Sequence, residues 1–245
     1  MKKIALLLVA LFALAATPAF AQVSLNIGGE GGSVTGNTIQ IIALLTVLSL
    51  APSILMMMTS FTRIIVVFSF LRSAIGIQQT PPNAVLISLA MFLTLFIMMP
   101  TFQAAYTSGI QPMMNESMPE MEAMTKAVQP FKKFMLENTR EKDLKLFVEI
   151  NKAGPFKDSM ETPLQYVIPA FMISELRRAF EIGFLLFLPF LVIDMVVSSI
   201  LMSMGMMMLP PVMISLPFKI IFFVLVDGWY MITGSLIQSY GVGGG

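Results

Sequence analysis

The sequence predicts an all-α membrane protein made of two apolar helical hairpins, with a small charged helical insertion between them. The first observation is composition: 56% of the 245 residues are hydrophobic and only 12% are charged, whereas soluble domains average about 25% charged residues. The second is the distribution of charge, since residues 106–163 hold eight of the fifteen basic and nine of the fourteen acidic residues. The flanking stretches are long enough and apolar enough to form helices that enter a membrane.

Several classes of chemistry are excluded because the chain has no cysteine and no histidine. Disulfides, zinc sites with cysteine or histidine ligands, haem ligation and catalysis by Ser-His or Cys-His pairs all need these residues. The net charge of +1 provides no strong field for nucleic acid. We therefore predict no metal, no cofactor and no nucleic-acid partner.

The N-terminus has the pattern of a cleavable signal peptide over residues 1–21. Lys2 and Lys3 precede a short apolar core, and Ala19-Phe20-Ala21 places small residues at the two positions that a signal peptidase reads. Cleavage would leave Gln22 as the first residue, on the far side of a bacterial inner membrane. Residues 22–38 and 241–245 are predicted to be flexible Gly-rich tails.

The first apolar hairpin is predicted over residues 39–105, with Arg63 and Arg72 near its turn. Residues 72–82 read as the connecting loop, and Asn83 as the cap of a second helix that ends near Ala105. Taken with the second hairpin, this pattern predicts four membrane spans.

The charged insertion over residues 106–163 is predicted to be helical and to lie outside the membrane, on the periplasmic side. Its apolar residues are compatible with one face of an amphipathic helix: Phe131, Phe134, Met135, Leu144, Phe147 and Val148. The second apolar hairpin follows over residues 164–240. Its prolines, including Pro169 and Pro189, are expected to interrupt its helices.

A few charged residues lie inside this second hairpin. Four of them share one predicted helix: Glu175, Arg177, Arg178 and Glu181. The spacing allows a Glu175–Arg178 pair and an Arg177–Glu181 pair along the helix surface. Asp194 and Asp227 are intramembrane acids, which normally face protein or water because an ionised group in lipid is costly.

Residues 202–211 are predicted to form a tight, methionine-rich loop between the two helices of the second hairpin. Five of seven consecutive residues are methionine, among them Met204, Met206, Met207 and Met208. Gly205 permits a bend, and Pro210 and Pro211 cannot continue the incoming helix. Because methionine is unbranched and conformationally adaptable, the cluster is suited either to packing or to moulding around irregular shapes.

Three segments resemble the signatures of the FliP family, the core membrane proteins of the flagellar type III export gate, which are related to the SctR family of injectisomes. They are residues 169–183 (PAFMISELRRAFEIG), 189–194 (PFLVID) and 61–64 (FTRI), and the methionine loop with its prolines also matches. The resemblance covers roughly residues 41–240.

The resemblance implies a ring of several copies, expected to be a pentamer, joined by FliQ and FliR and working with FlhA and FlhB. Unfolded flagellar subunits would pass through its centre, at the flagellar basal body in the bacterial inner membrane and on its periplasmic side. The family's methionine loop carries over onto Met204, Met206, Met207 and Met208 as a pore gasket. Its charged helix carries over onto Glu175, Arg177, Arg178 and Glu181 as packing and intersubunit contacts.

Two other functions stay open on the residues alone. Asp194 and Asp227 could share a proton as an intramembrane aspartyl protease does, although no Gly-x-Gly precedes Asp227. The same acids could form the proton relay of a secondary transporter, although the two apolar halves do not match each other as inverted repeats would. A non-enzymatic channel subunit is the leading interpretation.

Overall fold

The computed structural model describes residues 41–42, 45–46, 49, 53–54, 56–77, 79–151, 156, 158–206 and 209–241. The chain divides into two compact units, Met1–Leu50 and Ala51–Gly245, and the helices below all belong to the second. The predicted signal peptide, the 22–38 tail, Met207, Met208 and residues 242–245 lie outside the described residues.

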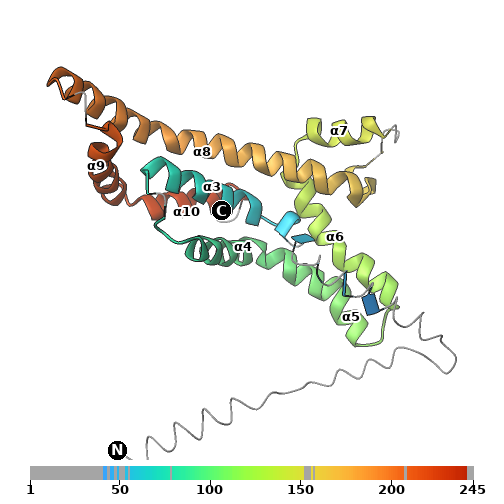
Figure 1. The fold of residues 1–245 in the computed structure, drawn as a ribbon. Helices are drawn as coiled ribbons and strands as arrows, with labels where there is room; N and C mark the ends of the chain where they lie inside the picture. Colours follow the sequence, from blue (N-terminus) through green and yellow to red (C-terminus); the bar gives the residue numbers. More distant parts are fainter. Residues whose placement is uncertain are drawn as a thin grey trace, which may run out of the picture. The chain divides into compact units, whose positions relative to one another are not determined.

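Every regular element of the second unit, within the described residues, is helical (Figure 1). In chain order the elements are α3 (Phe61–Ile75), α4 (Asn83–Ala105), the π-helical turn η1 (Tyr106–Ile110), α5 (Gln111–Met114), α6 (Glu120–Asn138), α7 (Glu141–Ile150), the 3₁₀ turn η2 (Ser159–Glu161), α8 (Leu164–Ser203), α9 (Pro211–Leu225) and α10 (Gly228–Gln238).

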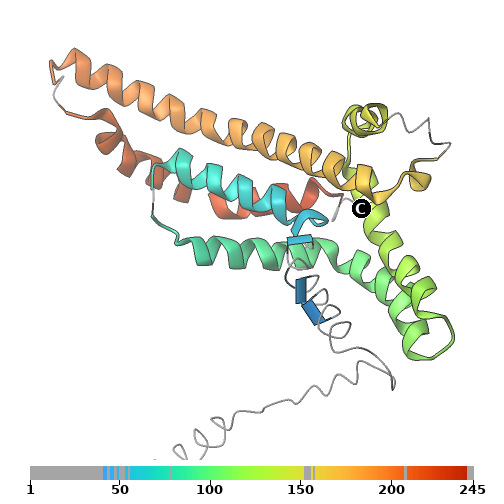
Figure 2. The ribbon, with the colours of Figure 1, turned by 45° about the vertical axis from the view of Figure 1, so that its right-hand side comes forward.

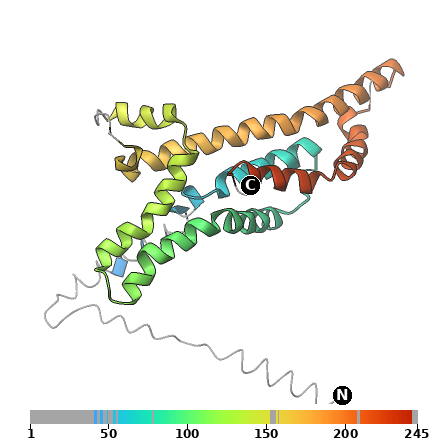
Figure 3. The same cartoon turned by 180° about the vertical axis from the view of Figure 1, so that it is seen from behind.

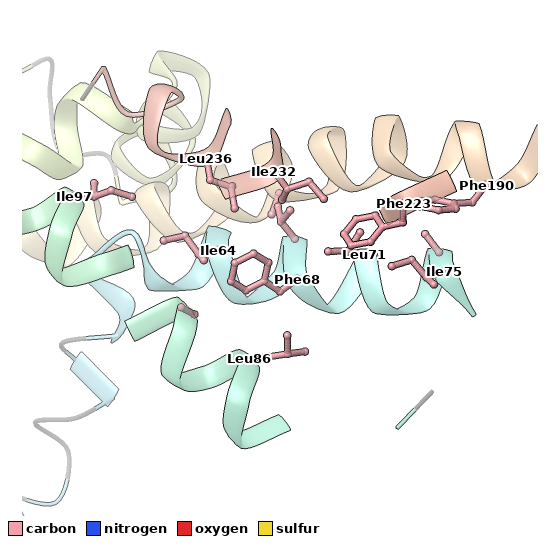
Figure 4. Packing of buried hydrophobic residues seen from close by; sticks show 14 residues of the cluster. Ile64, Phe68, Leu71, Ile75, Leu86, Ile97, Phe190, Phe223, Ile232 and Leu236 are labelled. Carbon is pink, nitrogen blue, oxygen red and sulfur yellow. The ribbon is translucent and has the colours of Figure 1, made fainter. Parts of the chain in front are cut away.

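Helix α3 lies between α8 on one side and α4 on the other (Figure 2). Its buried face presents Ile64, Val67, Phe68 and Leu71, all at most 1% exposed. These positions follow the three- and four-residue spacing of one helical stripe. Figure 4 shows this stripe meeting Leu86 of α4, Phe190 of α8, Phe223 of α9 and Ile232 of α10. The core is therefore organised around α3.

The α3–α4 turn differs from the prediction. Helix α3 continues through Arg72 to Ile75 and is followed by Gly76, which has φ +90°, so Arg72 belongs to the helix and not to the loop. Asn83 is the first residue of α4, and its side chain caps no backbone N–H. Instead its Oδ1 accepts a hydrogen bond from Arg72. The predicted cap is wrong because this side chain is used across the turn.

Helix α8 runs unbroken for 40 residues with Pro169 and Pro189 inside it, which corresponds to about 60 Å. The expectation that these prolines interrupt the helix is therefore wrong. A proline removes one hydrogen bond and strains one turn. In an apolar segment, however, leaving the helix would expose many more backbone groups that have no water to bind.

The charged insertion contains the short helix α5 and the longer helices α6 and α7, together with the turns η1 and η2. Helix α6 packs beside α4, η1 and α8, and α7 lies along the N-terminal part of α8 (Figure 3). Met135 of α6 joins Val167 and Phe171 of α8 in a second buried cluster. The placement of this insertion outside the membrane stays a prediction.

Two helices in the described part of the chain are long and apolar enough to cross a membrane, Asn83–Met114 and Leu164–Ser203. A third candidate is the pair α9 and α10, which is bent by 61° at its break. Two helices, or three if the bent pair is one span, therefore meet this criterion among the described residues. The first predicted span includes residues outside the described part of the chain, so the four spans stay a prediction. Helix α3 falls short because it has only 15 residues.

Candidate functional site

The loop between α8 and α9 begins with a left-handed glycine. Gly205 has φ +74°, and its N–H donates to the Met202 carbonyl at 3.1 Å while the Met206 N–H donates to the Leu201 carbonyl at 3.0 Å. A glycine in this conformation is a common way to end a helix. Pro210 then precedes α9 and Pro211 is its first residue, where a missing N–H costs no helical hydrogen bond.

The methionines of this loop that the structure describes face outward. Met204 is 66% exposed and Met206 is 41% exposed. Neither side chain belongs to a buried cluster. The described part of the loop therefore presents thioethers to whatever surrounds this end of the chain.

Much of α8 presents an apolar surface that the rest of the chain does not cover, since only nine of its 40 residues are buried. Its exposed large side chains include Phe180, Phe184, Leu185, Leu188, Leu191, Val192, Met195, Val196 and Ile200. A surface of this size needs lipid or other protein chains to cover it.

Asp194 of α8 is tied to α9 by two contacts. Lys219 Nζ lies 2.6 Å from Asp194 Oδ2, and the Ser215 hydroxyl donates to Asp194 Oδ1 at 2.6 Å. Lys219 also donates to the Ala74 carbonyl at the end of α3, at 3.2 Å. Lys219 is only 4% exposed. Its contacts with Asp194 and Ala74 connect α9 to α8 and to the end of α3.

Glu175 pairs with Arg63 of α3 and not with Arg178, which corrects one predicted pair. One edge of the guanidinium makes both contacts, since Arg63 Nε and Nη2 donate to the two carboxylate oxygens of Glu175. Glu175 and Arg63 are both fully buried. The i,i+3 spacing to Arg178 is compatible with contact, but Glu175 faces the core of the chain, where α3 supplies the cation.

The C-terminal end of the chain completes this buried cluster. The Tyr240 hydroxyl donates to Glu175, and Arg63 Nη1 donates to the Ser239 hydroxyl at 2.9 Å. The guanidinium also lies over the Tyr240 ring, 3.8 Å from its centroid. Burial and the charge of Glu175 raise the pKa of Tyr240 well above its usual value, so the phenol keeps the proton that it donates.

The remaining charged residues of α8 lie on its surface. Arg177 Nε donates to Glu181 Oε1 at 2.7 Å, and both side chains are more than half exposed, so this predicted pair is present in the structure. Arg178 has no ion pair among the described residues. Surface charges of this kind contribute little to the stability of a single chain.

Asp227 occupies the break between α9 and α10. It has φ 49° and ψ 54°, a left-handed conformation that is unfavourable for most residues except glycine, asparagine and aspartate. Its side chain is exposed, and within the described residues it forms no ion pair. Asp194, by contrast, is bound to Lys219 and Ser215, so the two acids have separate environments.

Sequence reasoning did not identify Arg63, Lys219 and Tyr240 as partners of the predicted acids. A signal was present, because Arg63 and Lys219 are each an isolated base in an apolar stretch, and such a base needs an acid nearby. Which acid each one meets depends on how the helices pack. Among the described residues, no group of three or more acidic side chains could hold a metal ion.

The helices and the buried charge pairs define an α-helical membrane protein with a large unpartnered apolar surface. Comparison with known proteins then identifies the family. The chain belongs to the FliP family, whose model matches residues 44–236.

Curated relatives agree with this family. The chain is 58% identical over 228 residues to the flagellar biosynthetic protein FliP of Caulobacter vibrioides, covering 93% of this chain and 86% of that protein. It is 56% identical over 204 residues to the protein of the same name from Bacillus subtilis, covering 83% and 92%. For the one from Aquifex aeolicus the identity is 50% over 214 residues, covering 86% and 89%.

Proposed function

We propose that this chain is a core channel subunit of the flagellar type III protein export gate. Several copies, expected to be five, would form a ring with FliQ and FliR. Unfolded flagellar subunits would pass through it across the bacterial inner membrane. Family membership and relatives named flagellar biosynthetic protein support this proposal.

The observation that carries the channel proposal is the unbroken α8 with its exposed apolar surface and its exposed methionine loop. A helix of 40 residues can bring the loop to a position far from the rest of the chain. Its apolar side chains would be covered by neighbouring copies and by FliQ and FliR. Such an arrangement brings the loops of several copies together around one axis.

Met204, Met206, Met207 and Met208 would then form a compliant gasket in the pore. Methionine has three rotatable bonds and no hydrogen-bonding demand, so a ring of methionines can close on itself or re-pack around a passing chain. Apolar constrictions also block ions by excluding water. Gly205 and the two prolines would hold the loop in place.

The charges support a structural role more than a catalytic one. The carboxylate of Asp194 already contacts the side chains of Lys219 and Ser215, which supports a structural role for it. We therefore propose that the chain is not an enzyme and that Arg177, Arg178 and Glu181 serve contacts between subunits. FlhA and FlhB would be further partners at the basal body.

The experiment that tests the gasket replaces Met206, Met207 and Met208 by Ala together. Assembly should persist, because Met206, the one described residue of the three, belongs to no buried cluster. The membranes that contain the variant should leak small ions. Conductance or solute uptake is measured at equal expression. The matched control replaces three other exposed methionines, Met114, Met121 and Met124. A loop variant that assembles and stays as tight as wild type would overturn the gasket.

The relay alternative is tested by Asp194→Asn and Asp227→Asn. Export by both variants, once they assemble, excludes a requirement for either carboxylate. Normal assembly with export abolished, while the proton gradient is intact, would favour the relay over a purely structural role.

A further inference from the structure

An apolar cavity of about 210 Å³ lies where the end of α3 meets the break between α9 and α10. Its walls include Leu71 and Ile75 of α3, Ile220 and Phe223 of α9, and Trp229 of α10. Figure 4 shows Leu71, Ile75 and Phe223 gathered at this end of the core. Phe223 and Trp229 pack edge to face with centroids 5.6 Å apart, which fixes the shape of the aromatic wall.

Three apolar residues of the lining are also exposed at the surface of the chain. Val224 is 70% exposed, and Ile220 and Trp229 are 38% and 37% exposed. These residues lie on the α9–α10 pair, which is itself a candidate membrane span. An occupant of the cavity would therefore enter from an apolar phase.

One cation, Arg72, lies at the rim of this cavity. Its only side-chain partner among the described residues is the Asn83 amide oxygen, which accepts from Nη1, and it forms no ion pair with a carboxylate there. Asp227, the acid nearest in sequence to Trp229, makes no ion pair with Arg72 among the described residues either. A guanidinium has five N–H donors in a fork that matches phosphate, so most of its donors are available to an anion.

We propose that this cavity binds an anionic phospholipid, with part of an acyl chain between Ile220, Phe223 and Trp229 and the headgroup phosphate held by Arg72. The charge at the rim complements the phosphate, and the apolar walls complement the acyl chain. An uncharged apolar occupant would make no ionic contact with Arg72, and free phosphate would make no contact with the apolar walls. The site is independent of the channel proposal, because it lies within one copy.

The test uses Trp229, the one tryptophan of the chain, as a local reporter. The full-length chain is purified in detergent, and phosphatidylglycerol brominated on its acyl chains is added in small steps. Bromine quenches indole fluorescence only at short range. Saturable quenching is expected, with half-saturation on the order of tenfold lower for phosphatidylglycerol than for brominated phosphatidylcholine, since one charged hydrogen-bonding contact is gained.

Two pairs of variants separate the headgroup contact from the acyl-chain contact. Arg72→Gln should abolish the preference for phosphatidylglycerol. Arg178→Gln, a change at an arginine of α8 that has no ion pair among the described residues, should keep it. Ile220→Phe fills the cavity and should remove saturable quenching by both lipids. Ile221→Phe, one residue along α9 and outside the cavity lining, should leave quenching unchanged.

The proposal is overturned by equal half-saturation for the two lipids in wild type, or by a preference that survives Arg72→Gln. Displacement of the brominated lipid by inorganic phosphate alone would also overturn it, because the acyl chain would then contribute nothing. The same titration on the chain assembled with its partners must still show quenching assigned to Trp229 by comparison with Trp229→Phe. Its loss there would show that another protein, and not lipid, fills the cavity.

Discussion

Arg63 on α3 and Glu175 on α8 form a buried, two-point ion pair between residues 112 positions apart in the chain. Tyr240 and Ser239 close around the same pair from the C-terminal end. Helix α3, helix α8 and the residues after α10 therefore all contact this ion pair inside an apolar core. The pair fixes which turn of α8 faces α3, because a one-turn slip would bury both charges without partners.

Glu175→Ala should therefore destabilise the fold severely, by about 3–5 kcal/mol, because Arg63 is left buried and unpaired. The matched control is Glu181→Ala on the same helix, whose partner Arg177 is exposed. That variant should unfold like wild type, with its effect confined to the size of the assembled oligomer. Heat-induced unfolding of the detergent-solubilised chain and size-exclusion chromatography measure the two effects. Equal thermal losses would contradict the assignment.

The Asp194–Lys219 pair should show strong energetic coupling. Asp194→Asn leaves the buried Lys219 without its counter-ion, and Lys219→Met leaves Asp194 without its cation, so each single change should cost several kcal/mol. The double variant should cost less than the sum of the two, with a coupling of about 1–3 kcal/mol. A double-mutant cycle on unfolding midpoints measures this. Simple additivity would show that the two side chains act independently.

Asp143 should hold α7 against α8 at all but strongly acidic pH. Burial opposes its ionisation, but hydrogen bonds from Ser174 and Arg140 outweigh that and lower its pKa. A lowered pKa in the folded state stabilises the fold fully above the unfolded value of about 3.9. This stabilisation is lost as the pH falls through the folded pKa.

Hydrogen exchange of the α7 backbone amides tests this contact between α7 and α8. At pH 7, the α7 amides of Asp143→Asn should exchange faster than those of wild type, because Ser174 of α8 and Arg140 lose the charged oxygen that accepts their hydrogen bonds. The two proteins should converge as the pH falls through the folded-state pKa of Asp143, since the wild-type carboxyl is then protonated. A difference that persists unchanged at low pH would count against the carboxylate as its cause. Glu141→Gln, at an exposed acid of the same helix, is the control.

Gly109→Ala should weaken the contact between η1 and α6. A Cβ at Gly109 would lie 2.4 Å from the Ala123 carbonyl oxygen and 2.6 Å from the Ala127 Cβ. The helices would have to separate, at a cost of about 1–3 kcal/mol. In contrast, a Cβ at Gly234 of α10 meets nothing within 4 Å, so Gly234→Ala should be neutral or stabilising. Thermal unfolding of both variants measures the difference, and a neutral Gly109→Ala would disprove the close contact.

The all-helical class, the apolar hairpins and the place of the methionine loop followed from the sequence because they depend on local properties. Hydrophobic composition sets whether a segment enters a membrane. Glycine and proline set where α8 ends and α9 begins, and the structure has Gly205 and Pro211 at those positions. Family membership was also recognisable, because its signatures are contiguous runs of residues.

The partners of the charges and the continuity of α8 were decided by tertiary structure alone. Spacing along a helix paired Arg177 with Glu181, which is a local contact, but it also paired Glu175 with Arg178. In the structure Glu175 pairs with Arg63. This pairing depends on tertiary structure, because the position of α3 decides which side of α8 is buried. Likewise, Pro169 and Pro189 stay within α8 because an apolar surrounding makes breaking a helix more costly than bending it.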